Sequence, residues 1–141
     1  MAQEATSKHQ ARVKWDADQN DLRAHMIELA DQRLAASGAE ALGGDPAKAD
    51  PEELFVASLS SCHMLWFISL ARAERLRVTA YEDEAVGTLD ATRFTGVVLR
   101  PRVSFANDPG AERVLDLHHR AHEHCYIANS VNCPVTVEPR S

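Results

Sequence analysis

Two cysteines lie in segments of different character, and their thiols are the side chains that point most directly to a chemical function. Cys62 lies within a long apolar segment, LFVASLSSCHMLWF, whereas Cys125 follows the histidine-rich segment AHEH. A thiol becomes nucleophilic when a nearby cation favours its thiolate. A sulfenic acid formed on one cysteine is trapped as a disulfide when a second thiol lies within reach. The sequence therefore indicates thiol–disulfide chemistry if the fold brings Cys62 and Cys125 together.

Core packing is the competing interpretation of each thiol, because free cysteine often behaves as a small apolar side chain. Cys62 lies about three turns into its predicted helix, too far from the N-terminus for the helix dipole to activate it. A cation must therefore come from elsewhere in the fold. The third cysteine, Cys133, precedes Pro134 and has no partner at a suggestive spacing, so we interpret it as a packing residue.

Composition predicts one soluble globular domain over residues 1–141, with residues 1–10 as a flexible N-terminal segment. A net charge of −6 without a basic cluster argues against a nucleic-acid or anionic-membrane partner. The polar start MAQEATSKHQ argues against a signal peptide, and Ser, Cys and His interrupt the longest apolar run. Three cysteines, an odd number, indicate a reducing compartment. We therefore expect a cytoplasmic protein without a membrane span.

The N-terminal third is expected to form strands. Apolar and polar residues alternate over 11–16, a turn follows at 16–21, and residues 22–29 return as a second strand. A helix over 21–36 remains an alternative, because Leu, Ala, Met and Glu favour helices. Residues 38–50 are rich in Gly, Pro and Ala and predict a loop.

A long helix is predicted to begin with an Asp50 N-cap and Pro51 and to run to about Arg75. Its middle is apolar on nearly every face, so we expect burial on all sides by the domain core or by a partner subunit. Strands are expected from 78 past 87, over 95–105 and at 132–137. A second helix begins after 107–109, and its apolar stripe is expected to consist of Ala111, Val114, Leu115, His118, Ala121, His122 and Cys125. The order predicts an α+β fold with a mostly antiparallel sheet around one buried helix.

The second helix carries a histidine cluster next to Cys125. His118 and His122 are four residues apart and share a helix face, a spacing that can hold zinc or copper with Cys125 or Cys62 as a third ligand. No C-x-x-C pair or carboxylate completes a recognised site. We therefore assign no metal and no cofactor, and interpret the histidines as partly exposed residues that suit the negative helix end.

Two motifs about 60 residues apart give the chain a resemblance to the OsmC/Ohr family of thiol-dependent peroxidases, which reduce organic hydroperoxides. The segment DPEELFVA at 50–57, followed by Ser61-Cys62, resembles the family's N-P-E-x-L-F-x-A-x-x-x-x-C segment. The pattern A-H-x-x-C-x-x-x-N at 121–129 resembles the segment around the family's second cysteine. This resemblance implies an OsmC-like homodimer with two intertwined sheets around the central helices and active sites at the subunit interface.

Roles for individual residues follow from the same resemblance. Cys62 resembles the peroxidatic cysteine and Cys125 the resolving cysteine. Glu52 resembles the glutamate that orients an activating arginine. Arg23 is our choice for that arginine, and Arg33 is the runner-up.

The implied reaction converts Cys62 to a sulfenic acid, which Cys125 resolves to a disulfide that an external dithiol reduces. Helical spacing places Leu59, Leu65 and Trp66 near Cys62, where an apolar wall would favour an alkyl or lipid hydroperoxide. The family usually has an apolar residue at the position of His63 and a proline at that of Tyr126. The C-H-M-L sequence after Cys62 therefore resembles a distinct branch, and binding of a small apolar ligand without turnover is the alternative function.

Overall fold

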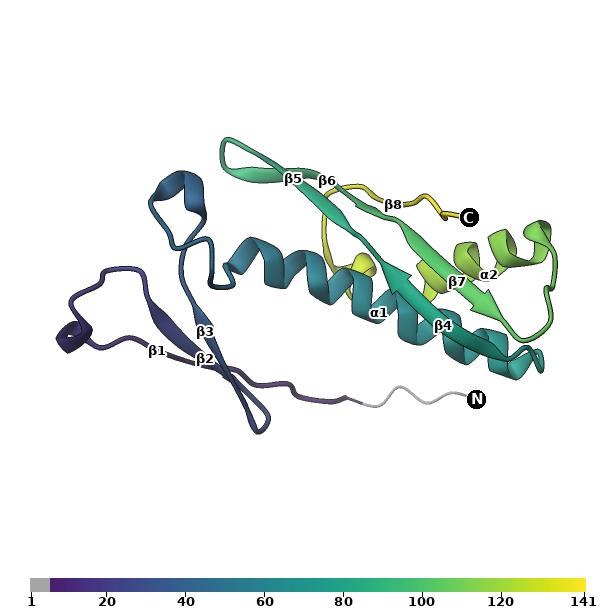
Figure 1. Ribbon diagram of the computed structural model, residues 1–141, viewed down its shortest axis with the longest axis horizontal. Coiled ribbons are helices and arrows are strands. Elements are labelled where there is room, and N and C mark those ends of the chain that lie inside the picture. The colour runs from purple at the N-terminus through teal and green to yellow at the C-terminus, as the bar shows by residue number, and fades with distance from the viewer. Residues whose placement is uncertain (1–5) are drawn as a thin grey trace. The chain divides into compact units, whose positions relative to one another are not determined.

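Strands and helices follow one another in the order of an α+β domain, as the sequence predicts. The computed structural model describes residues 6–141 (Figure 1). Its regular elements are β1 (Arg12–Lys14), β2 (His25–Leu29), β3 (Gln32–Ala36), α1 (Pro51–Ala73), β4 (Val78–Asp83), β5 (Val86–Asp90), β6 (Arg93–Leu99), β7 (Pro101–Phe105), α2 (Ala111–His124) and β8 (Val135–Val137). Three short 3-10 helices lie at Ala17–Gln19, Glu40–Leu42 and Ala128–Ser130.

The described chain divides into two compact units, the first ending at Glu52 and the second beginning at Glu53. In the first unit β1, β2 and β3 form an antiparallel sheet. Residues 21–36 therefore form strands, and the helical alternative for this segment is wrong. The β2–β3 turn contains Ala30 with a φ of 54°. Residues 6–10 have no regular structure, and the rest of the predicted flexible segment lies outside the described residues.

The second unit contains both helices and two small sheets. β4 pairs with β7, and β5, β6 and β8 form the other sheet, in which only the β6–β8 pair is parallel among the described strands. The stretch expected as one strand over 95–105 is two strands that meet at Arg100. Pro101 begins β7, which is consistent with its lack of a backbone N–H donor. Its carbonyl oxygen accepts a hydrogen bond from the backbone N–H of Arg140 at 2.8 Å.

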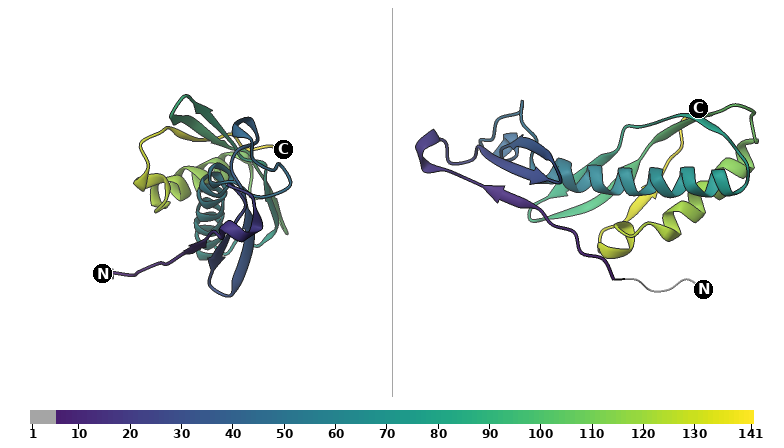
Figure 2. Two further views of the ribbon diagram at one scale, coloured as in Figure 1. Left: turned by 90° about the vertical axis from the view of Figure 1, so that its left-hand side faces the viewer. Right: turned by 90° about the horizontal axis from the view of Figure 1, so that it is seen from below.

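The core of the second unit lies along one face of α1. The buried residues of this helix recur every four positions and are Leu59, His63, Phe67 and Ala71. Leu59 packs with Val97 and Leu99 of β6, whereas Phe67 and Ala71 pack with Leu117 and Ala121 of α2. Figure 2 shows α2 running alongside the C-terminal half of α1.

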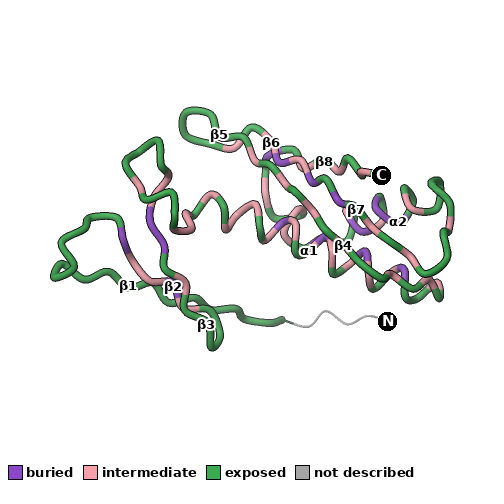
Figure 3. Tube along the Cα trace, viewed as in Figure 1, coloured by how far each residue is buried: buried purple, intermediate pink, exposed green. Residues whose placement is uncertain are grey.

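Burial of α1 on all sides, as the sequence analysis expected, is not found within one chain. Only the four-residue stripe is buried, and Figure 3 shows intermediate or exposed residues along the remainder of the helix. Leu65, for example, is 62% exposed. Within the second unit the apolar faces away from the stripe are therefore only partly covered, and the sequence signal of an all-round apolar helix points to surfaces that suit a further partner.

α1 is also long and apolar enough to cross a membrane, judged by length and composition only. The expectation that Ser, Cys and His interrupt this segment too often for it to span a membrane is therefore wrong as far as composition is concerned. Those polar residues make contacts within the second unit instead. The Ser60 hydroxyl donates to Asp83 of β4, and the His63 ring is hydrogen-bonded to that of His118 of α2. Such contacts are typical of a core helix.

The C-terminal end of α1 is fixed by its backbone and by ion pairs. Arg75 has a φ of 62°, and the N–H of Leu76 donates to the Ala71 carbonyl at 2.9 Å, the geometry of a Schellman cap. Glu74 then forms ion pairs with Arg113, at 3.1 Å, and with Arg120 of α2. These guanidinium groups hold the pKa of Glu74 below its ordinary value, chiefly through the Arg120 hydrogen bond. The two helices are thus joined where α1 ends.

The buried face of α2 is rotated from the predicted one. Leu117, His118, Ala121 and the C-cap residue Cys125 are buried, whereas Leu115 is 56% exposed. The prediction that Leu115 belongs to the buried stripe is therefore wrong. The helix begins after Gly110, whose φ of 94° favours glycine and whose N–H donates to the Asp108 carboxylate at 2.8 Å.

Leu117 and Leu115 provide a test of this packing with two leucines on one helix. We expect Leu117→Ala to lower the free energy of unfolding by about 2–5 kcal/mol, because it leaves a cavity against Phe67 and Ala71. Leu115→Ala should change it by less than about 1 kcal/mol, because its side chain is largely solvated. Urea denaturation measures both values. An equal loss of unfolding free energy in the two variants would contradict the observed orientation of α2.

Candidate active site

Cys62 lies beside the buried stripe of α1 rather than within it. The next residue, His63, is 1% exposed and belongs to the stripe, and successive helical residues point about 100° apart. Cys62 is therefore half-buried, with its thiol at the border between the core and the accessible surface. A peroxidatic thiol needs this position, because it must meet a substrate as well as a second thiol.

Cys125 lies at the C-cap of α2 and is 1% exposed. Its sulfur accepts a hydrogen bond from the Ala128 backbone N–H at 3.4 Å. Burial raises the pKa of the Cys125 thiol above its ordinary value, and a side-chain hydrogen bond with Cys62 raises this pKa further. The two cysteine side chains therefore lie near one another, and no disulfide joins them. The structure brings together the two cysteines that the sequence analysis paired.

Cys133 lies in a different part of the second unit. It is 9% exposed and packs with Leu59, Val97 and Leu99, which agrees with the packing role expected of it. One side of it lines a pocket of about 490 Å³, to which the stacked rings of Phe55 and Phe94 also contribute.

The candidate activating residues lie in the first unit. Arg23 precedes β2, and its side chain runs past Gly38 and under Gly43, where an added Cβ would lie 3.1 Å from the guanidinium carbon. Arg33, the runner-up, lies on β3, and its Nε is 3.6 Å from the Glu28 carboxylate. Glu52 is half-buried in the first turn of α1. Arg33 thus forms a salt bridge within its own sheet, whereas the Arg23 side chain lies against the loop that contains Gly38 and Gly43.

The three residues expected to form an apolar wall have different surroundings. Leu59 is fully buried in the core and has no exposed surface to offer a substrate. Leu65 is 62% exposed. Trp66 stacks on the His124 ring, with centroids 4.9 Å apart, and meets the edge of Tyr126 at 5.7 Å. An apolar surface near Cys62 would therefore be made by Leu65 and Trp66 rather than by Leu59.

A buried histidine pair is the feature that sequence reasoning missed. His63 Nε2 and His118 Nδ1 are 3.0 Å apart, and their rings are stacked with centroids 5.2 Å apart. His118 is 3% exposed, so its interpretation as a partly exposed helix-end residue is wrong. Burial lowers the pKa of each ring to about 4, which makes both neutral near pH 7. The sequence feature that could have predicted the burial of His63 is its spacing of four residues from both Leu59 and Phe67, which places it on their helix face.

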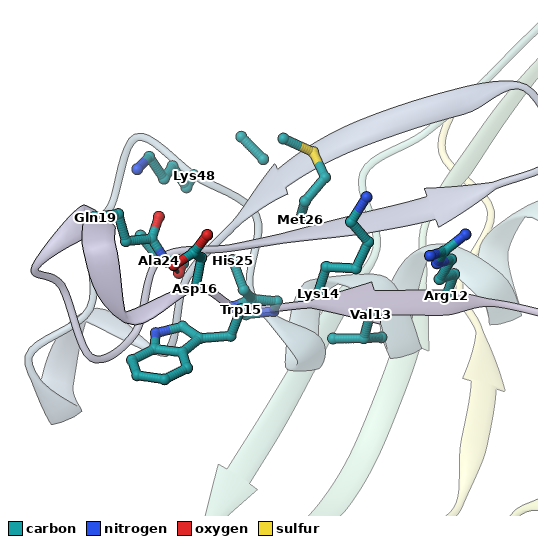
Figure 4. A pocket seen from close by; sticks show the side chains of 11 residues that line it. Arg12, Val13, Lys14, Trp15, Asp16, Gln19, Ala24, His25, Met26 and Lys48 are labelled. Atoms are coloured by element: carbon teal, nitrogen blue, oxygen red, sulfur yellow. Dashed lines mark hydrogen bonds between the residues drawn. The ribbon is translucent and has the colours of Figure 1, made fainter.

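A separate pocket of about 620 Å³ lies within the first unit, between β1, β2 and the segments around them (Figure 4). Arg12, Lys14 and Lys48 give it a basic lining, and Trp15 forms part of its apolar side. Glu28 lies 3.8 Å from Arg12 and 3.5 Å from Lys14, so part of this positive charge is balanced. The described residues that line it include none of the predicted catalytic side chains.

Comparison with known proteins identifies the fold. The sequence model of the OsmC-like protein family matches residues 43–140. An OsmC-like protein of unknown function from Vibrio cholerae O1 biovar eltor is 40% identical, with a TM-score of 0.89 over 96% of this chain and 100% of that chain. None of the curated proteins compared with the chain matches it.

More distant structures share the fold. An organic hydroperoxide resistance protein from Legionella pneumophila is 22% identical, with a TM-score of 0.74 over 96% of this chain and 97% of that chain. The organic hydroperoxide resistance protein of Bacillus subtilis is 21% identical, with a TM-score of 0.67 over 96% of this chain and 100% of that chain. The family match covers more than half of the sequence, and the chain therefore belongs to the OsmC-like protein family.

Proposed function

We propose that this protein is a cysteine-based peroxidase that reduces organic hydroperoxides to alcohols. The nearness of the Cys62 and Cys125 side chains, one on α1 and the other at the end of α2, supports this proposal. Cys62 is half-buried and Cys125 is buried, which suits an attacking cysteine that meets a substrate and a resolving cysteine that does not. Family membership supports a peroxide-related stress role, since structural relatives include organic hydroperoxide resistance proteins.

In the first step the Cys62 thiolate attacks the terminal oxygen of the hydroperoxide. An S–O bond forms, the O–O bond breaks, and the alkoxide leaves and takes up a proton to give the alcohol. The sulfur is thereby oxidised to a sulfenic acid. Cys62 is half-buried, so part of this residue remains accessible to a substrate.

In the second step Cys125 resolves the sulfenic acid. Its sulfur attacks the Cys62 sulfur, the S–O bond breaks, the thiol proton and the hydroxyl group leave as water, and a disulfide remains. An external dithiol then reduces this disulfide through a mixed disulfide and is itself oxidised. Burial keeps Cys125 protonated until this step, because its pKa is raised. The proximity of the sulfurs favours disulfide formation over further oxidation of Cys62.

Arg23 is our proposed activator of Cys62, with Glu52 as the residue that orients it. A guanidinium group near the thiol would favour the thiolate and donate hydrogen bonds to the incoming peroxide. The engagement of Arg33 with Glu28 favours Arg23 over the runner-up. Arg23 is therefore assigned a catalytic role and Arg33 a structural one.

The preferred substrate in this proposal is an alkyl or lipid hydroperoxide. Leu65 presents an exposed apolar side chain, and Trp66 extends the apolar surface toward Tyr126. Apolar contacts of this kind would bind the alkyl chain and add nothing for hydrogen peroxide, because burial energy scales with apolar area. Leu59, fully buried, supports the helix beneath this surface.

A homodimer in the cytoplasm completes the proposal. Members of the OsmC-like family are often homodimers, which supports self-association of this chain. The apolar faces of α1 that are only partly covered within the second unit are the surfaces we assign to the interface. The exposed side chain of Leu65 lies on such a face.

Single cysteine variants separate the two proposed roles. Cys62→Ser should abolish consumption of cumene hydroperoxide. Cys125→Ser should allow one turnover, after which mass spectrometry should find Cys62 as a sulfinic or sulfonic acid, because no thiol traps the sulfenic acid. Cys133→Ser is the control and should retain activity and form the Cys62–Cys125 disulfide. Wild-type activity in Cys62→Ser would overturn the mechanism and favour ligand binding without turnover.

The two arginines can be compared in the same assay. Loss of a charge-assisted hydrogen bond costs about 1.5–3 kcal/mol, so Arg23→Ala should lower the rate of Cys62 oxidation by about 10- to 100-fold. Arg23→Lys should restore part of the rate, because a cation remains. Arg33→Ala should leave the rate within about 2-fold, since surface ion pairs contribute little. The reverse ranking would assign the activating role to Arg33.

The raised pKa of Cys125 predicts an order of alkylation. At pH 8 iodoacetamide should modify the half-buried Cys62 before Cys125, because a raised pKa leaves Cys125 mostly as the unreactive thiol. The labelling rate of Cys125 should continue to rise above pH 9, where an ordinary cysteine levels off. Peptide mapping over a pH series measures both rates, with the unfolded protein as reference. Faster labelling of Cys125 in the folded protein at pH 8 would contradict its assigned environment.

A further inference from the structure

A groove of about 270 Å³ lies between α2 and β8, and three histidines of α2 line it. His118, His119 and His122 form one side, and Val135, Thr136 and Val137 of β8 form another. None of these residues takes part in the proposed peroxidase chemistry. A concave site with several histidines is a candidate for a ligand of its own.

Two ring nitrogens at this groove are buried without a hydrogen-bond partner in the part of the chain that the structure describes. They are His118 Nε2 and His122 Nδ1. Folded proteins rarely leave a buried polar atom unsatisfied, because its desolvation is then uncompensated. His118 as a whole residue is 97% removed from solvent, given its exposure of 3%. The two nitrogens therefore point to a bound species that satisfies both.

We propose that this groove binds a late first-row divalent metal ion through His118 and His122. The two residues are four positions apart on α2, the spacing that places two imidazoles on one helix face. Neutral imidazole nitrogen is a preferred ligand of nickel, copper and zinc ions. No group of three His, Cys, Asp or Glu side chains within residues 6–141 is arranged around one point. An ion held by these two side chains would therefore take its remaining ligands from water.

The buried histidine pair would act as the supporting layer of this site. A ring that ligates a metal usually donates its other N–H to an acceptor, which fixes its tautomer. His118 Nδ1 lies 3.0 Å from His63 Nε2, and donation from His118 to His63 leaves the lone pair of His118 Nε2 free for the metal.

The test is titration of the reduced full-length protein with Ni²⁺ by calorimetry and with Co²⁺ by absorption. We expect one ion per chain and at least about 10-fold weaker binding in His122→Ala, because one of two protein ligands is lost. His119→Ala is the matched control and should bind as the wild type, since His119 is exposed and paired with Glu123 at 3.6 Å. His63→Phe should weaken binding by about 10- to 100-fold through loss of the supporting hydrogen bond.

Three outcomes would overturn the proposal. Absence of binding by the folded wild type at micromolar protein would do so, as would equal affinity of His122→Ala and the wild type. A sulfur-to-cobalt charge-transfer band that disappears in Cys125→Ser would assign the ion to a thiol instead. Thermal unfolding of each variant without metal confirms that it is folded, so weaker binding by a folded His122→Ala variant supports the site.

Discussion

The stripe of buried residues that recurs every four positions along α1 is the constraint on which the rest of the structure depends. Leu59 anchors its first half against β6, and Phe67 anchors its second half against α2 and the β4–β7 pair. A four-residue repeat slightly exceeds the 3.6 residues of a helical turn, so the stripe winds slowly around the helix. The two halves consequently face different partners, and one helix serves two separate packing clusters.

This geometry also determines the environment of each thiol. Cys62 is adjacent in sequence to the stripe residue His63 and so lies at its border, whereas Cys125 ends the buried face of α2. Docking of α2 on α1 brings the two cysteine side chains near one another. Their nearness follows from the same apolar burial that stabilises the fold.

Much of this arrangement could be predicted from the sequence, because local signals and family motifs agree. Pro51 marks the start of α1, alternation marks the strands, and the two motifs that resemble the family paired Cys62 with Cys125. The face of α2 was harder to predict, because Leu115 and Leu117 are equally apolar and only tertiary packing distinguishes them. The expectation that α1 is buried on all sides was wrong for another reason. Apolar composition shows that a helix surface is suited to burial, but it does not show which chain covers that surface.

The histidine pair shows most clearly what sequence polarity conceals. Histidine is usually half-exposed, and a cluster of four near a helix end resembles a solvated, dipole-stabilised surface. His63 nevertheless occupies a core position, because its ring stacks on His118, which in turn packs against Phe67 at a centroid distance of 4.3 Å. One hydrogen bond joins the two rings, whereas His63 Nδ1 and His118 Nε2 have no partner among the described residues.

The same pair makes the core sensitive to acid. Both rings have a folded-state pKa of about 4, below the ordinary value of 6.5, so the unfolded chain binds more protons between these values. The stability that depends on the neutral pair is present above pH 6.5 and is lost as the pH falls toward 4. An apolar residue after Cys62 would avoid this loss. A core that accepts two histidines thus gains hydrogen-bonding and ligating capacity at the expense of stability in acid.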